Sequence, residues 1–150
     1  MKKLIGFFGE QIGSRVPEVY AHCDLFCGVY DPAQARIEAQ AVYNAVEKYK
    51  ASEDEIFRQR AVMIKEERAE LVKHHLWVLW TDYFKPDHLE VVSDLHQLFW
   101  QATKAASQAK KTMEIKDAQN LIEAVDRVGH AFAQTKPGYS YQAVIDNLQA

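Results

Sequence analysis

The chain lacks a disulfide framework, a long apolar run and an excess of basic residues, and each absence excludes a class of protein. Its 150 residues include only two cysteines, which are too few to staple a small secreted fold. No apolar run approaches the ~20 residues that a transmembrane helix requires. The net charge of −3 argues against a nucleic-acid partner, because phosphate binding depends on concentrated lysine and arginine.

Strand periodicity and internal repeats are also missing, whereas helical periodicity is strong. A chain of this length can bury a sizeable core as a single domain. Four helices joined by short connections favour an all-α, up-down antiparallel four-helix bundle. Apolar residues recur at helical spacing in four segments, about 31–50, 52–83, 89–109 and 118–135, and a further amphipathic turn is expected over 142–149.

Local signals predict where these helices begin and which faces they bury. Asp31 is expected to cap the first helix with Pro32 in its first turn, and Ser52 with Glu55 forms a capping box before the second. The predicted apolar faces are Ile37, Ala41, Ala45 and Tyr49 in the first helix; Phe57, Ala61, Ile64, Leu71, His75 and Val78 in the second; Leu95, Leu98, Phe99, Ala102 and Ala106 in the third; and Leu121, Val125, Val128 and Phe132 in the fourth.

Residues 1–21 precede this pattern and are predicted to be a removable leader. The segment begins with a basic pair, as an export signal does, but its apolar core is only "LIGFF" before Glu10 interrupts it. An export signal requires about 7–15 apolar residues at this position. We therefore expect a cytoplasmic protein with an amphipathic leader rather than an exported one, and a mature domain over 22–150.

Both cysteines lie in the stretch "HCDLFC", which begins where the predicted leader ends. If the chain is cut between Ala21 and His22, the new terminus offers an amine and an imidazole. Cys23 adds an amide nitrogen and a thiolate, and Cys27 adds a second thiolate. Tetragonal nitrogen and sulfur ligands suit Ni(II) or Cu(II), whereas zinc prefers a tetrahedron. An uncut leader would block such a site, because its peptide bond consumes the amine.

On residue types alone, other interpretations of the two thiols stay open: one disulfide staple, a zinc or copper pair, or inert side chains. A carboxylate-bridged di-iron bundle fits poorly, because Glu66, Glu67 and Glu70 lack the Glu-x-x-His partners that such sites use. His74 and His75 are adjacent on a helix and face different directions, which argues against a joint metal site.

The chain resembles nickel superoxide dismutase in three stretches, "HCDLFCGVYDPAQARIEA", "RAVMIKEERAELVKHH" and "VLWTDYFKPDHLE". The resemblance extends from His22 to about Lys136, and residues 137–150 form an extension beyond it. The family pattern H-C-x-x-P-C-G-x-Y matches at its histidine, both cysteines, Gly28 and Tyr30. The resemblance implies a homohexamer of four-helix bundles with a nickel ion. It also implies a leader-processing protease and a nickel chaperone as partners.

The activity implied by the resemblance is conversion of superoxide to oxygen and hydrogen peroxide by Ni(III)/Ni(II) cycling. His22, Cys23 and Cys27 would hold the nickel. Tyr30 would stand over the open face of the metal, and Asp24 would shape the approach of superoxide. The pattern leaves the proton donor open between bound water, Tyr30 and a protonated thiolate.

We name residues 22–30 the hook. The resemblance also assigns roles to three residues outside the hook. Glu38 and Arg68 would orient the axial imidazole, and Tyr83 would lie near the hook. The chain departs from the family pattern at Phe26, where the family has a proline that shapes the hook. This departure leaves an alternative function, a catalytically silent relative that keeps the fold and acts as a binding or assembly subunit.

Overall fold

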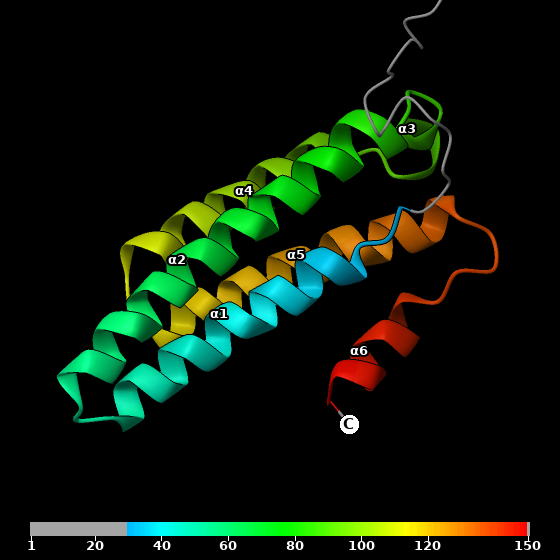
Figure 1. Ribbon diagram of the computed structural model, residues 1–150. Helices are drawn as coiled ribbons and strands as arrows, with labels where there is room; N and C mark the ends of the chain where they lie inside the picture. The colour runs from blue at the N-terminus through cyan, green and yellow to red at the C-terminus, as the bar shows by residue number, and fades with distance from the viewer. Residues whose placement is uncertain (1–29, 150) are drawn as a thin grey trace, which may run out of the picture.

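The computed structural model is described over residues 30–149, which form helices joined by short loops (Figure 1). Within this range there are six α-helices and one π-helical turn, and no strand. The predicted all-α class is confirmed. His22, Cys23, Asp24 and Cys27 lie outside the described residues.

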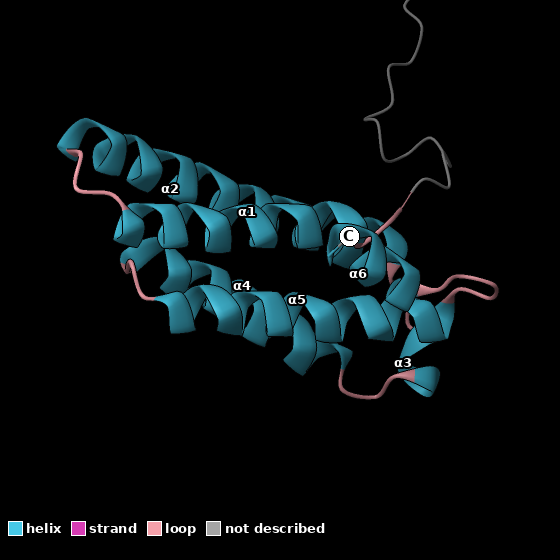
Figure 2. Ribbon diagram, turned by 90° about the horizontal axis from the view of Figure 1, so that it is seen from below, coloured by secondary structure: helices cyan, strands magenta, loops and turns pink. Residues whose placement is uncertain are grey.

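Four long helices form the bundle: α1 (Ala33–Ala51), α2 (Glu55–Val78), α4 (Leu95–Lys111) and α5 (Ile115–Thr135). α1 packs against α2 and α5, and α4 packs against the same two helices. Consecutive long helices run in opposite directions, as the two views show (Figures 1 and 2). This arrangement confirms the predicted up-down four-helix bundle.

The two ends of the bundle differ in what connects the helices. Short loops at residues 52–54 and 112–114 lie at one end, which we call the loop end. Tyr30 lies at the opposite end, where the hook would join α1, and we call this the hook end. Here α2 continues into the π-helical turn η1 (Leu79–Tyr83), and α3 (His88–Val91) leads into α4 (Figure 1).

The start of α1 follows the sequence signals. A carboxylate oxygen of Asp31, Oδ1, accepts a hydrogen bond of 2.8 Å from the amide of Ala33. Pro32 already has helical dihedral angles, and its carbonyl accepts from the amide of Arg36. Proline fits this position because its missing N–H would have no partner in the first turn.

The predicted cap of α2 is wrong by two residues. Asp54, rather than Ser52, caps the helix, because its Oδ1 accepts from the amides of Ile56 at 2.9 Å and Phe57 at 3.2 Å. The Ser52 hydroxyl oxygen accepts from the Asp54 amide and so holds the turn before the cap. The carboxylate is closer to the first free helical amides and is a stronger acceptor than a hydroxyl.

The predicted apolar faces of the last two long helices are confirmed almost in full. Leu98 is the exception, since it is only half-buried. The prediction for the first two helices is partly wrong, because several of their large residues lie at the surface. Ile37, Phe57 and Ile64 are 48%, 41% and 45% exposed. The residues buried instead are Ala35, Ala39, Val42 and Val46 in α1 and Lys65, Ala69, Val72 and Leu76 in α2.

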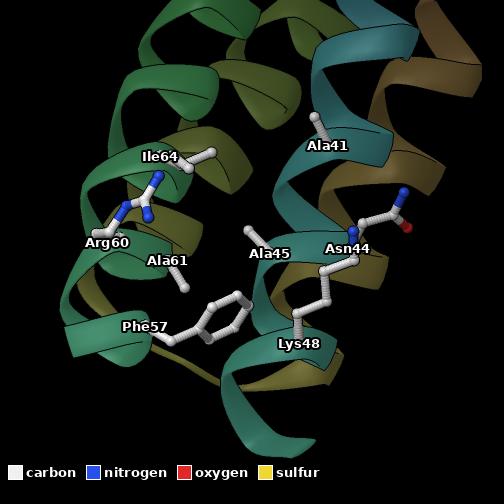
Figure 3. A pocket seen from close by; sticks show the side chains of 8 residues that line it. All are labelled: Ala41, Asn44, Ala45, Lys48, Phe57, Arg60, Ala61 and Ile64. Atoms are coloured by element: carbon white, nitrogen blue, oxygen red, sulfur yellow. The ribbon is translucent and has the colours of Figure 1, made fainter. Parts of the chain in front are cut away.

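Two of these displaced residues, Phe57 and Ile64, line a hollow of about 370 Å³ between α1 and α2 (Figure 3). Figure 3 shows the ring of Phe57 reaching from α2 toward α1, beside Ala45 and Ala61. Alanine on the buried faces allows the two helices to approach closely, so the bulkier neighbours have room only at the edge of the contact. The charged side chains that line this hollow, Lys48 and Arg60, are both cationic.

Lys65 is a buried lysine that closes the C-terminus of α4. Its side chain is 2% exposed, and its Nζ donates to the carbonyls of Lys110 and Thr112. The last carbonyls of a helix have no partner within the helix and carry partial negative charge, so an ammonium group stabilises them. Burial lowers the pKa of Lys65.

The predicted final helix is confirmed as α6 (Tyr141–Gln149), which lies against α1 and α5. The side chain of Tyr141 is 1% exposed and packs over Gly129 of α5, where a Cβ would come within 2.1 Å of the ring. Its hydroxyl donates to Asp126, which also accepts from the buried Arg36 at 2.9 Å. One ring and one ion pair therefore fix α6 to the bundle.

In the described part of the chain, every helix is too short or too polar to cross a membrane.

Candidate functional site

The hook end of the bundle brings together segments that are distant in sequence. Tyr30 precedes α1, Tyr83 ends η1, and Thr135 ends α5 (Figure 1). The π-helical turn places Tyr83 here because it widens the last turn of α2, and Phe84 leaves the helix in an extended conformation. The attachment point of the hook is thus surrounded by helix ends, where backbone and side-chain polar groups are available.

Tyr83 is the centre of an aromatic cluster. Its ring lies 5.9 Å from that of Tyr30, 4.3 Å from that of Phe132 and 5.3 Å from the imidazole of His88, onto which it stacks. Phe84 meets it edge to face at 5.0 Å. Such aromatic pairs are stabilising in these geometries, so the wall beside Tyr30 is built from mutually packed rings.

The direction of the Tyr83 hydroxyl proton follows from its partners. The hydroxyl oxygens of Tyr83 and Thr135 lie 3.1 Å apart. Thr135 donates its only hydroxyl proton to the carbonyl of Phe132, at 2.9 Å. Tyr83 is therefore the donor to Thr135. Its proton points into the end of α5, and its free lone pairs are left to accept hydrogen bonds.

The last residue of the hook and the residue after it are held by residues near the C-terminus. Lys136 Nζ donates to the carbonyl of Tyr30 at 3.2 Å. Tyr139 donates from its hydroxyl to Asp31 Oδ1 at 2.6 Å. Burial raises the pKa of Tyr139, and the carboxylate of Asp31 raises it further, so this hydroxyl remains protonated and continues to donate.

Glu38 and Arg68 form an ion pair between α1 and α2. The Arg68 Nη1 atom lies 3.4 Å and 3.3 Å from the two carboxylate oxygens of Glu38. Glu38 is 14% exposed and Arg68 is 36% exposed. The pKa of His75 is lowered, mainly by burial and also by the neighbouring His74. The charge of Glu38 acts in the opposite direction and raises this pKa.

The structure brings together the four predicted site residues that it describes, as two pairs: Tyr30 with Tyr83, and Glu38 with Arg68. The predicted ligands and Asp24 lie outside the described residues. From residue 30 to residue 149, no group of three histidine, cysteine or acidic side chains is arranged to hold a metal ion.

Sequence reasoning missed four residues at this end: Asp31, Thr135, Lys136 and Tyr139. Asp31 was identified only as a helix cap, although it directly follows Tyr30. The signal for Lys136 and Tyr139 was weak, because "KPGY" is a common helix-stop pattern and says nothing of contacts more than 100 residues away.

The donor set of the hook fits nickel on chemical grounds. An amine, an amide nitrogen and two thiolates give the tetragonal nitrogen and sulfur surroundings that Ni(II) prefers, and the imidazole of His22 remains as a further donor. Hard cations such as magnesium and calcium require oxygen ligands instead. His22, Cys23 and Cys27 remain the predicted ligand set.

Comparisons with known proteins agree with this chemistry. A family model described as nickel-containing superoxide dismutase matches residues 17–136. A relative named for this activity and for nickel, from Streptomyces seoulensis, is 51% identical over 119 residues, which cover 79% of this chain and 91% of the relative. Another, from Streptomyces coelicolor, is 50% identical over 118 residues, covering 79% and 90%.

The fold of solved structures agrees as well. A crystal structure of nickel-containing superoxide dismutase, after partial X-ray-induced reduction, superimposes with a TM-score of 0.73 at 51% identity, over 76% of this chain and 97% of that chain. A native nickel superoxide dismutase structure gives a TM-score of 0.73 at 49% identity, over the same shares. The chain belongs to the nickel-containing superoxide dismutase family.

Proposed function

We propose that this chain is a nickel-dependent superoxide dismutase, which becomes active when cleavage before His22 exposes the amine of the hook. The observation that carries the proposal is the family match over residues 17–136, which spans the whole hook at about half identity to named relatives. This match favours the enzyme over a catalytically silent relative. Two molecules of superoxide and two protons give oxygen and hydrogen peroxide.

The nickel ion, when bound by His22, Cys23 and Cys27, supplies one-electron redox chemistry between Ni(III) and Ni(II). The protein would provide the surroundings. Tyr30 borders the site with its phenol, and the ring of Tyr83 fixes the position of the Tyr30 ring at 5.9 Å. Because the Tyr83 proton points to Thr135, Tyr83 is not assigned as the donor to a bound anion.

Glu38, Arg68 and Asp24 are proposed to position the hook rather than to react. The ion pair of Glu38 with Arg68 holds a carboxylate at a fixed place in the second turn of α1. A carboxylate that accepts from a ligating imidazole fixes its ring orientation and raises its basicity, which is the role we assign to Glu38. Asp24 would shape the approach of superoxide from within the hook.

The partners follow from the same proposal. A protease must remove residues 1–21, and a nickel chaperone would deliver the metal, both in the cytoplasm. A homohexamer is supported by large apolar side chains left at the surface of the described chain: Ile56, Met63, Trp77 and Trp100 are each at least half exposed. Isolated exposed apolar residues are ordinary, but bulky ones of this kind are enriched at subunit contacts.

The direct test is superoxide dismutation by a chain produced with His22 as its first residue and loaded with nickel. Cys23→Ser and Cys27→Ser should each abolish activity, because a hydroxyl does not replace a thiolate ligand. A matched control, Ser107→Cys, adds a thiol far from the hook and should leave activity unchanged. Full activity in either serine variant would overturn the proposal. An inactive wild-type chain that keeps the fold would favour the silent relative instead.

A further inference from the structure

We propose that the C-terminal tail, residues 137–149, is a strap that positions the attachment point of the hook, with Tyr139 as the positioning residue. This inference rests on the proposed function, because it concerns how the chain holds its own metal loop. The tail lies beyond the family match, which ends at residue 136.

The tail begins with a turn that aims Tyr139 back at α1. Gly138 has a φ of +78°, a left-handed conformation that favours glycine, and no atom lies within 4 Å of where its Cβ would be. The amide of Tyr139 donates to the carbonyl of Lys136 and closes the turn at 3.1 Å. The ring of Tyr139 meets Phe132 edge to face at 5.0 Å. The turn and the contact with Phe132 thus fix the position of the Tyr139 ring.

The partner of Tyr139 is Asp31, the first residue after the hook. One oxygen, Asp31 Oδ1, accepts both from the Tyr139 hydroxyl at 2.6 Å and from the amide of Ala33 at 2.8 Å. Hydrogen bonds to a carboxylate are about twice as strong as those between neutral groups. The first turn of α1, and the backbone of Tyr30 before it, are consequently fixed to the tail.

The remainder of the tail keeps Tyr139 in place. Tyr141 is buried over Gly129, where only a glycine leaves room for the ring. Its hydroxyl donates to Asp126 at 2.9 Å, and Asp126 is paired with Arg36, which is 3% exposed. Arg36 lies in the first turn of α1. The tail therefore contacts the beginning of α1 twice, once through Tyr139 and once through the network of Tyr141.

The functional consequence concerns a loop that lacks the proline found in the family pattern. A short metal loop whose second attachment point is fixed loses less conformational freedom when it closes around the ion. With Phe26 in place of that proline, the chain has one local constraint fewer in the hook. The tail supplies a constraint from outside the hook, because it fixes Asp31, the residue directly after Tyr30.

The experiment compares nickel release from three chains that begin at His22: wild type, Tyr139→Phe and the matched control Tyr43→Phe. Tyr43 also has a phenol bonded to a carboxylate, that of Glu47, but it lies further along α1. Nickel transfer to excess EDTA and the electron paramagnetic resonance spectrum of the oxidised metal are measured. Amide hydrogen exchange at Asp31 and Ala33 is followed in the nickel-free chains.

We expect Tyr139→Phe to release nickel about tenfold faster than wild type, the order of change that one hydrogen bond to a charged group produces. Exchange at Ala33 should also accelerate, and the resonance spectrum should broaden. Tyr43→Phe should match wild type in all three readouts. Gly129→Ala, which displaces Tyr141 without altering any tail residue, should behave like Tyr139→Phe.

Identical release and exchange in Tyr139→Phe and wild type would overturn the strap. Equal acceleration in Tyr43→Phe would do so too, because the effect would then be one of general stability. A wild-type chain that retains no nickel would overturn the proposed function instead. In that case, exchange at Asp31 and Ala33 still decides whether the tail holds this segment.

Discussion

The hook end and the loop end of the same bundle are built from different residues. Toward the loop end, α1 and α2 meet through alanines such as Ala45 and Ala61, and a buried lysine closes α4. At the hook end, an aromatic cluster is added to the helix contacts: Tyr83 alone contacts Tyr30, Phe84, His88 and Phe132. The difference teaches that stability and site geometry are separable here, since close helix packing needs small residues and a rigid wall needs large planar ones.

Lys65→Ala is expected to give the largest change in stability. The contacts that it removes all lie at the loop end. The substitution removes a buried side chain and leaves the carbonyls of Lys110 and Thr112 without their donor. We expect the free energy of unfolding to fall by about 3 kcal/mol, measured by urea denaturation. Nickel release from the folded chain should not change. Faster release would show that the two ends are coupled after all.

Gly129→Ala tests the hook end through its packing. An alanine in a helix interior is favourable by about 1 kcal/mol over glycine, but its Cβ would meet the ring of Tyr141. Overpacking of this kind costs about 1–3 kcal/mol. The net loss in unfolding free energy should be about 1 kcal/mol by thermal denaturation, smaller than for Lys65→Ala, yet nickel release should accelerate. A more stable variant with unchanged release would refute the close packing.

Arg68→Gln sharpens the separation between stability and activity. The pair of Arg68 with Glu38 is partly exposed, so its loss should change the unfolding free energy by less than about 1 kcal/mol. Loss of a residue that orients a ligating group typically costs at least about tenfold in activity or metal affinity. Steady-state dismutation assays should show that loss. Arg60→Gln, an exposed change on the same helix, serves as the control, and equal activities in both variants would contradict the assigned role.

His75 gives the smallest expected effect, a change in pH dependence. Burial lowers the pKa of His75 below its ordinary 6.5, so the unfolded chain binds the proton more readily than the folded chain. The stability contributed by neutral His75 is therefore complete above about pH 6.5 and is lost as the pH falls through the folded-state pKa. His75→Gln should flatten this slope in unfolding experiments between pH 7 and pH 5, taken as a range about the ordinary histidine value. An unchanged slope would contradict the assignment.

Much of the fold could be predicted because the apolar pattern of the last two long helices is unambiguous. Leu121, Val125, Val128 and Phe132 form one apolar stripe along α5, and all four are buried. The pattern failed in α1, where alanine at Ala35 and Ala39 competes with the larger Ile37 for the buried face. A prediction from sequence assigns the largest apolar residues to the buried face. Closely packed helices instead bury small residues where they touch.

The ligands of the site stay a prediction from the sequence and its resemblance, because His22, Cys23 and Cys27 lie outside the described residues. The supports could not be predicted at all. The supports Tyr139 and Thr135 depend on contacts with Asp31 and Tyr83, which are 108 and 52 residues away in the chain. No local periodicity records such pairs. The direction of the Tyr83 proton likewise emerges only from its bonded neighbours.

The central claim is that a cut chain holds nickel through the amine of His22, and the most direct test is the intact mass and metal content of the protein purified from its own host. The account predicts a chain that begins at His22, with one nickel ion bound to each chain. A chain that begins at Met1 and carries no nickel would contradict it.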